Sequence, residues 1–210
     1  MIKFIFLYLF LFILNSNELY CKTKIVLFGD SLMAGYGLEK KDHLSTILQH
    51  SLKNKGYDVK VINASVSGDT TNGGLNRLNW TLEERDLGIF ILCLGANDML
   101  RGLKPEIIKE NLRNIIMLVK KRKIKILLAG MLAQRSYGLE YKSEFDKIYE
   151  DLAREFKIFY IPFLLEGVAL KKEYNLPDGK HPNKKGIKII SNNIQKEIIL
   201  MLKDEKNKRS

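Results

Sequence analysis

Three side chains have the types and the spacing that nucleophilic attack on a carbonyl carbon requires. Ser31 comes three residues after the short apolar run that ends at Phe28, and His181 comes three residues after Asp178, far along the chain. A serine hydroxyl is a weak nucleophile, and an imidazole can take up its proton during the attack. A carboxylate that accepts the imidazole Nδ1 proton fixes the tautomer and stabilises the imidazolium. We therefore predict Ser31 as nucleophile, His181 as general base and Asp178 as the acid that orients the base.

The negative charge that develops on the carbonyl oxygen during such an attack needs preorganised hydrogen-bond donors. Candidate donors are the backbone N–H groups of Ser31 and Gly68 and the side-chain amide of Asn97. Because Gly68 has no side chain, a substrate can approach its backbone closely. The neighbouring Asp98 is interpreted as a local capping residue and not as a second catalytic acid.

Alternating strands and helices are predicted to position these groups. Five short runs rich in β-branched, leucine and aromatic residues predict strands, at 24–28, 58–63, 87–94, 125–129 and 158–161, of which 24–28 and 87–94 should be buried. Apolar residues at helical spacing predict helices at about 44–52, 74–82, 105–119, 141–156 and 183–203. Such alternation is typical of a parallel sheet with helices on both faces, in which ligands bind beyond the carboxyl ends of the strands. The candidate groups come just after predicted strands or just before the last helix.

Four sequence blocks resemble those of the GDSL/SGNH hydrolases and stand in the same order. They are Gly29-Asp30-Ser31-Leu32, Gly68, Gly95-x-Asn97-Asp98 and Asp178-x-x-His181. The longer segments 63–70, 94–103 and 178–183 are similar to the subgroup of bacterial periplasmic acyl esterases that includes thioesterase I, lysophospholipase and arylesterase. The resemblance covers roughly residues 24–203. It implies a three-layer α/β/α flavodoxin-like fold with a five-stranded parallel sheet. It also implies a Ser31–His181–Asp178 triad, an oxyanion hole of Ser31, Gly68 and Asn97, and no cofactor.

Three positions depart from the usual pattern of this subgroup. Asp42-His43-Leu44 stands where relatives carry a Trp-Pro pair, Cys93 stands where Glu is frequent, and Lys180 replaces an apolar residue in the Asp–His turn. None of these changes removes a catalytic group. They bear on the choice of substrate more than on catalysis.

Other enzyme classes fit the sequence poorly. An α/β-hydrolase needs Gly-x-Ser-x-Gly around the nucleophile, which is missing at Ser31, and Gly35-Tyr36-Gly37 lacks the third glycine of a dinucleotide-binding loop. We expect no metal site, because His43 and His50 are ordinary helix residues and Cys93 lies within an apolar strand.

Two alternatives on the same fold stay open. One is a carbohydrate O-acetyl esterase. The apolar stretches 99–103, 131–132 and 163–165 favour an acyl chain instead, unless they are only core residues. The other is a non-catalytic ligand-binding module, which should have lost Ser31, Asp178 or His181.

The ends of the chain and its net charge add predictions about location and partners. Residues 1–21 have a basic start, an apolar run and a polar exit, which predicts a signal peptide or, as the alternative, an uncleaved membrane anchor. Residues 22–203 would then form the hydrolase domain and 204–210 a charged tail, with the protein periplasmic or secreted. The net charge of +11 comes from scattered lysines without a nucleic-acid-binding motif, so we expect no nucleic-acid partner. The expected partners are a small ester and, transiently, a lipid surface.

Overall fold

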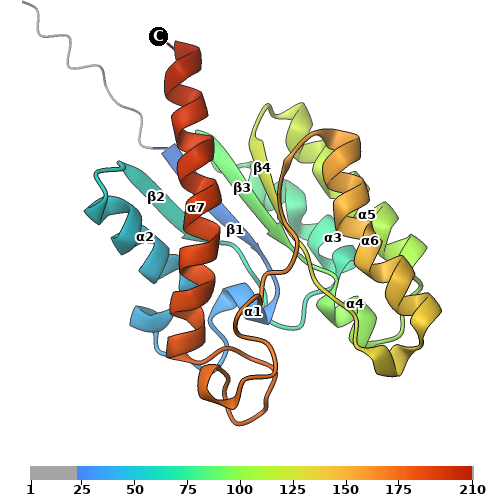
Figure 1. Cartoon of the computed structure of the whole chain (residues 1–210). Coiled ribbons are helices and arrows are strands. Elements are labelled where there is room, and N and C mark those ends of the chain that lie inside the picture. The colour runs from blue at the N-terminus through green and yellow to red at the C-terminus, as the bar shows by residue number, and fades with distance from the viewer. Residues whose placement is uncertain (1–22, 210) are drawn as a thin grey trace, which may run out of the picture.

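The protein folds around one five-stranded sheet. The computed structural model describes residues 23–209, and all neighbouring strands in the order β2-β1-β3-β4-β5 run parallel. The strands are β1 (Thr23–Gly29), β2 (Val59–Asn63), β3 (Leu87–Cys93), β4 (Lys125–Ala129) and β5 (Phe159–Ile161). These are the five strands that the sequence predicts, and the sheet confirms the expected fold class (Figure 1).

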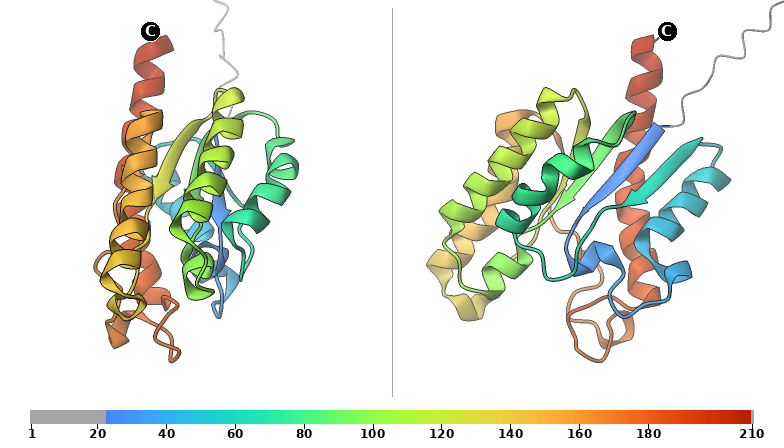
Figure 2. Two further views of the ribbon diagram at one scale, coloured as in Figure 1. Left: turned by 90° about the vertical axis from the view of Figure 1, so that its right-hand side faces the viewer. Right: turned by 180° about the vertical axis from the view of Figure 1, so that it is seen from behind.

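Helices cover both faces of the sheet. α2 (Leu44–Asn54) packs against α7 (Lys184–Arg209) on one face. On the other face α3 (Thr71–Leu82) packs against α5 (Pro105–Lys121), which in turn contacts α6 (Leu139–Phe156). The view from behind in Figure 2 shows α3 and α5 in front of the strands, opposite to α7. Right-handed crossovers between parallel strands explain this division into two helical layers.

Short elements fill the connections. Two helices of one turn, α1 (Ser31–Ala34) and α4 (Ala96–Leu100), follow β1 and β3. Three 3₁₀ turns are η1 (Lys40–Asp42), η2 (Arg135–Tyr137) and η3 (Lys172–Tyr174). α1, α4 and the chain around residues 162–183 lie at the lower end of the molecule in Figure 1, where the strands end. This end of the molecule carries the candidate site.

Two helices differ from the sequence-based prediction. α3 begins at Thr71 and not near Gly74, since Thr70 caps it by accepting a hydrogen bond from the Gly73 N–H at 3.1 Å. Two consecutive glycines hide this first turn from a search for apolar periodicity. α7 continues to Arg209, so the helix runs through most of the segment that was expected to be a tail.

The central strands β1 and β3 are buried on both faces. Val26 and Leu27 point to opposite faces of β1, yet neither is exposed to solvent, and the same holds for Phe90 and Ile91 of β3. This burial explains why the sequence shows continuous apolar runs instead of alternation. Cys93 at the end of β3 is also inaccessible, and burial raises the pKa of its thiol well above the usual range, as expected for an inert thiol.

Over residues 23–209, no helix has the length and apolar character that a membrane crossing needs. The predicted signal peptide or anchor, residues 1–21, lies outside the described residues.

Candidate active site

Ser31 is the first residue of α1, immediately beyond the carboxyl end of β1. Asp30 caps this helix, because its Oδ1 accepts a hydrogen bond from the Leu32 N–H at 3.0 Å and its carbonyl oxygen accepts one from the Ala34 N–H at 2.9 Å. The N–H of a first helical residue has no acceptor within the helix. Ser31 therefore offers both its hydroxyl group and a backbone N–H without an intrahelical acceptor at the edge of the sheet.

The turn from Asp178 to His181 brings an oriented imidazole to that hydroxyl. His181 Nε2 lies 2.9 Å from Ser31 Oγ, and His181 Nδ1 lies 2.8 Å from Asp178 Oδ2. Asp178 Oδ1 accepts hydrogen bonds from the backbone N–H groups of His181 at 3.0 Å and Lys180 at 2.8 Å. These hydrogen bonds, led by the two backbone donors, lower the pKa of the Asp178 carboxyl to about 2. The Asp178 carboxyl is therefore ionised at pH values above about 2.

The loop that carries this turn is fixed by amide side chains. Asn175 is buried, and its Nδ2 donates to the carbonyl oxygens of Val168 and Lys171, both at 2.8 Å. The His181 carbonyl oxygen accepts from the Leu176 N–H at 2.7 Å. The ring of Tyr36 packs against the imidazole of His181, with ring centroids 4.4 Å apart. The base is held by its loop and by an aromatic neighbour.

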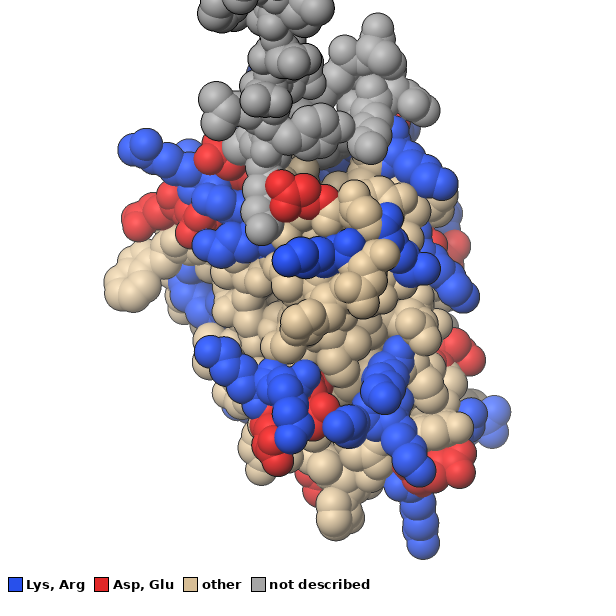
Figure 3. Space-filling view, turned by 90° about the vertical axis from the view of Figure 1, so that its left-hand side faces the viewer, with Lys and Arg blue, Asp and Glu red and all other residues tan. Residues whose placement is uncertain are grey.

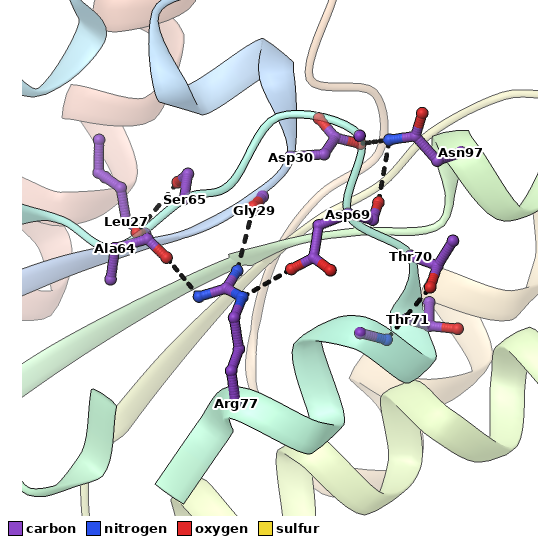
Figure 4. Close-up of polar contacts among 12 residues, drawn as sticks. Leu27, Gly29, Asp30, Ala64, Ser65, Asp69, Thr70, Thr71, Arg77 and Asn97 are labelled. Atoms are coloured by element: carbon purple, nitrogen blue, oxygen red, sulfur yellow. Dashed lines mark hydrogen bonds and ion pairs between the residues drawn. The ribbon is translucent and has the colours of Figure 1, made fainter. Parts of the chain in front are cut away.

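The predicted oxyanion donors lie on the loops after β2 and β3. Gly68 has φ +82°, a conformation that favours glycine, and its carbonyl oxygen accepts a hydrogen bond from Arg101 Nη2 at 3.0 Å. Asn97 Nδ2 donates to the Asp69 carbonyl oxygen at 2.9 Å and lies 3.3 Å from Asp30 Oδ2 (Figure 4). The Asn97 amide is therefore tied to both of the other loops of the site.

Asp98 is a capping residue, but it caps a helix distant in sequence. It is fully buried, and its two carboxylate oxygens accept hydrogen bonds from the Thr71 N–H at 2.9 Å and the Thr71 hydroxyl at 2.6 Å. Capping of α3 across the sheet edge fixes the loop that precedes that helix. The local cap that the sequence predicted is replaced by a long-range one.

The three departures from the family pattern lie beside the site without entering it. Asp42 pairs with Lys184 at 3.1 Å, which links η1 to the start of α7. His43 is the N-terminal cap residue of α2, with Nε2 3.2 Å from the Leu38 carbonyl oxygen. Cys93 is buried, and Lys180 contributes its backbone N–H to Asp178. Residues 23–204, whose side chains are described, contain no cluster of His, Cys, Asp and Glu that could hold a metal ion.

Sequence reasoning missed two groups that the structure places at the site. Arg77 of α3 donates a hydrogen bond to the carboxylate of Asp69, and Asp30 is almost fully buried. Burial is the main cause that raises the pKa of Asp30, to about 6, against the lowering effect of the Leu32 N–H. The sequence did carry a signal for Arg77, which is the single charged residue between Thr70 and Leu82.

We expect the buried Asp30 to make stability fall as pH rises from about 4 to about 6. The folded protein keeps this proton up to about pH 6, whereas an unfolded chain releases it near pH 4. The native state thus binds more protons than the unfolded chain between these pH values. A pKa shift of this size lowers the free energy of unfolding by about 3 kcal/mol at pH values above about 6. The Asp30→Asn variant lacks this group. Urea titrations should therefore show that the free energy of unfolding of the variant, minus that of the wild type, increases by about that amount between pH 4 and pH 7.

Asp151→Asn is the matched control for this measurement. Its carboxylate pairs with Lys109 at 2.7 Å, and that hydrogen bond lowers the pKa of Asp151. The dependence of stability on pH then has the opposite sign. The free energy of unfolding of Asp151→Asn, minus that of the wild type, should decrease as pH rises through the acidic range. Equal slopes for Asp30→Asn and the wild type would contradict the raised pKa.

Comparison with known proteins agrees with this geometry. The model of the GDSL-like lipase/acylhydrolase family matches residues 27–189. An arylesterase of Vibrio mimicus is 34% identical over 199 residues, covering 95% of this chain and 98% of the relative. The thioesterase 1/protease 1/lysophospholipase L1 of Escherichia coli strain K12 is 35% identical over 191 residues, covering 91% and 90%.

Solved structures give the same result for the fold. The crystal structure of TesA superposes with a TM-score of 0.81 at 33% identity, covering 85% of this chain and 99% of that one. The fold, the order of the sequence blocks and the family match over most of the chain agree with one another. This chain therefore belongs to the GDSL-like lipase/acylhydrolase family, a family of ester-hydrolysing enzymes.

Proposed function

We propose that the protein is a serine esterase that hydrolyses acyl esters through a covalent acyl-enzyme on Ser31. The single observation that carries the proposal is the continuous chain of hydrogen bonds from the Ser31 hydroxyl through His181 to Asp178, at 2.9 and 2.8 Å. In this role Ser31 is the nucleophile, His181 the general base and Asp178 the group that holds the base in its productive tautomer.

Acylation begins when Ser31 Oγ attacks the carbonyl carbon of the ester. The Oγ–C bond forms while His181 Nε2 takes up the hydroxyl proton, and the electron pair of the C=O bond moves to the oxygen. The tetrahedral intermediate then expels the alcohol or thiol, which receives the proton from His181 as the C–O or C–S bond breaks. The product of this half-reaction is Ser31 esterified by the acyl group.

Deacylation repeats the steps with water as the nucleophile. His181 takes a proton from water as its oxygen attacks the acyl carbon, and then returns a proton to Ser31 Oγ as the acid leaves. In both intermediates the oxyanion would accept from the Ser31 N–H, the Gly68 N–H and Asn97 Nδ2. Asn97 keeps one hydrogen on the Asp69 carbonyl oxygen, and its longer contact of 3.3 Å to Asp30 is the one it can give up.

Exposed apolar residues around the strand ends support an acyl chain over a sugar as the substrate group. Within the candidate stretches, Met99 and Met131 are core residues, but their neighbours Leu100 and Leu132 are 49% and 40% exposed. Val66, on the loop before Gly68, is exposed as well. A site for an O-acetylated sugar needs polar hydrogen-bonding groups where these apolar side chains stand. The printed names of the relatives, an arylesterase and a thioesterase/lysophospholipase, point in the same direction.

A panel of esters tests this function. We expect kcat/KM on p-nitrophenyl esters to increase from acetyl to a medium chain length, because each added methylene buries apolar area, worth about 0.8 kcal/mol when fully buried. A lysophospholipid should be cleaved, and an acetylated sugar should react more slowly than p-nitrophenyl butyrate. Preference for the acetylated sugar over every acyl ester would overturn the substrate class.

The predicted export of the protein favours lipids and exogenous esters as substrates, and the rim of the site supports contact with an anionic lipid surface. Leu170, in the loop between β5 and α7, is 93% exposed and has φ +64°, an unusual conformation for leucine. Lys171 and Lys172 follow it directly. Figure 3 shows blue side chains interspersed with tan surface and with several red side chains at the lower end of the molecule. An apolar tip flanked by lysines suits the headgroup region of a bilayer.

Replacement of Leu170 tests the lipid contact separately from the chemistry. We expect Leu170→Ser to reduce sedimentation with phosphatidylcholine/phosphatidylglycerol vesicles and to leave hydrolysis of p-nitrophenyl acetate unchanged. Leu200→Ser is the matched control, since Leu200 is 53% exposed on α7, towards the opposite end of the molecule. If both variants sediment like the wild type, the lipid contact through Leu170 is wrong, while the esterase function stands.

A further inference from the structure

Arg77 lies at the junction of the three loops that carry the proposed oxyanion donors. Its side chain is 23% exposed, and its three guanidinium nitrogens all donate hydrogen bonds. Nε donates to Asp69 Oδ2 at 2.6 Å, Nη1 to the Ala64 carbonyl oxygen at 2.5 Å and Nη2 to the Gly29 carbonyl oxygen at 3.3 Å (Figure 4). The guanidinium also covers the ring of Phe28, 3.9 Å from its centroid.

Two of the three acceptors of Arg77 stand close to donors of the proposed oxyanion hole. Gly29 ends β1, two residues before Ser31. Asp69 follows Gly68 directly, and the Asp69 carbonyl oxygen accepts from Asn97 Nδ2 at 2.9 Å. One planar side chain is thus connected, through at most two residues or one further hydrogen bond, to all three donors.

The chemistry of this cluster needs arginine. Only the guanidinium fork offers donors in fixed directions to one carboxylate and two carbonyl oxygens at once, whereas lysine is a single mobile point charge. Gly73 makes room for the carboxylate, because a Cβ at that position would stand 2.1 Å from Asp69 Oδ1. The Asp69 side chain is only 9% exposed, so removal of Arg77 would leave its charge uncompensated and the loop free to move.

We infer that Arg77 is a positioning residue for the oxyanion hole: through Asp69 and the Gly29 carbonyl it holds the N–H of Gly68, the amide of Asn97 and the nucleophile loop in mutual register. This inference rests on the proposed esterase function. Stabilisation of an oxyanion depends on donors that are already in place, and a displacement of about 1 Å can reduce a rate about a hundredfold. The effect of Arg77 should therefore appear in kcat, because the oxyanion exists in the transition state and not in the bound ester.

The experiment compares Arg77→Met and Arg77→Lys with the wild type on p-nitrophenyl butyrate. We expect kcat per folded molecule to fall about ten- to a hundredfold in Arg77→Met, with KM changed by no more than about twofold. Arg77→Lys keeps the charge and should recover only part of the loss. Arg113→Met is the matched control, since Arg113 of α5 also makes three hydrogen bonds, to Glu155 and Glu110, and its kcat should stay at the wild-type value.

A double-mutant cycle separates positioning from simple stabilisation. If Arg77 acts through the oxyanion hole, the loss caused by Arg77→Met should be smaller in an Asn97→Ala background than in the wild type. If Arg77 only stabilises the fold, the thermal midpoint falls while kcat per folded molecule is unchanged, and the inference is overturned. Should Arg77→Met fail to fold, Asp69→Asn, which preserves shape and backbone, must show the same loss of kcat for the inference to hold.

The outcome also stays distinct from a failure of the proposed function. Labelling of wild-type Ser31 by a fluorophosphonate and measurable ester hydrolysis establish the function independently of Arg77. Wild-type kcat in the Arg77 variants of such an active enzyme would reject the positioning role alone. An unlabelled wild-type protein would reject the esterase function, and with it the role of Arg77.

Discussion

Replacement of Ser31 by alanine is expected to reduce kcat for ester hydrolysis by roughly 10⁶-fold. The change removes the one oxygen that lies 2.9 Å from His181 Nε2, and with it the possibility of a covalent acyl-enzyme. Rates on p-nitrophenyl butyrate, with mass spectrometry of the fluorophosphonate-treated protein, give the measurement. The wild type should gain one label on Ser31 and the variant none.

His181→Ala provides the internal check on this prediction. Nucleophile and base act as one unit, so the Ser31→Ala/His181→Ala double variant should be hardly slower than either single variant. Losses that multiply in the double variant would mean that the two residues act independently. A folded wild-type protein that resists the label would favour a binding module on this fold.

Asp178→Asn is expected to lower kcat by roughly 10⁴-fold. The amide oxygen of asparagine can still accept from the backbone N–H groups of Lys180 and His181, so the turn keeps its shape. Its NH₂ group, however, would face His181 Nδ1 and donate to it. The imidazole then carries its proton on Nε2 and cannot accept the one from Ser31.

Two measurements separate loss of the fold from a change of the imidazole tautomer as the cause of the lower kcat in Asp178→Asn. Thermal unfolding and circular dichroism should resemble the wild type, while the rate of fluorophosphonate labelling falls with kcat. Asp151→Asn, a carboxylate paired with Lys109 between α6 and α5, should retain full activity. A mild loss in Asp178→Asn, within about tenfold, would show that the acid does not set the tautomer.

The strands and long helices were predictable because their signals are local. Each strand of this sheet coincides with a short run rich in apolar residues, and α5 and α6 carry clear apolar stripes at helical spacing. The one-turn helices α1 and α4 were not predicted, since four or five residues cannot display a period of 3.6. The early start of α3 was missed because its first turn contains two consecutive glycines and no apolar residue, and because the Asp98 carboxylate that supports it comes from another strand end.

The residues of the proposed triad were predictable for a different reason. Ser31, Asp178 and His181 have side chains whose chemistry narrows their use, and their order along the chain resembles a known family. The residues that support them carry weaker signals: Arg77 is the single charged residue between Thr70 and Leu82, and nothing in the sequence around it identifies its partners. The contacts of Arg77 with Asp69, and with the carbonyl oxygens at the ends of β1 and β2, form only when folding brings α3 beside these strand ends. Likewise, the raised pKa of Asp30 follows from burial, which no local pattern reveals.

The position of acid and base within one four-residue turn has a consequence for tolerance to change. Asp178 and His181 belong to one rigid loop, so any shift of that loop carries both together and preserves their mutual 2.8 Å contact. To assemble these three side chains, folding has to align only this loop with α1. Three side chains on three separate segments would need two such long-range alignments. An insertion elsewhere in the sheet connections leaves the contacts among Ser31, His181 and Asp178 intact as long as this one alignment is preserved.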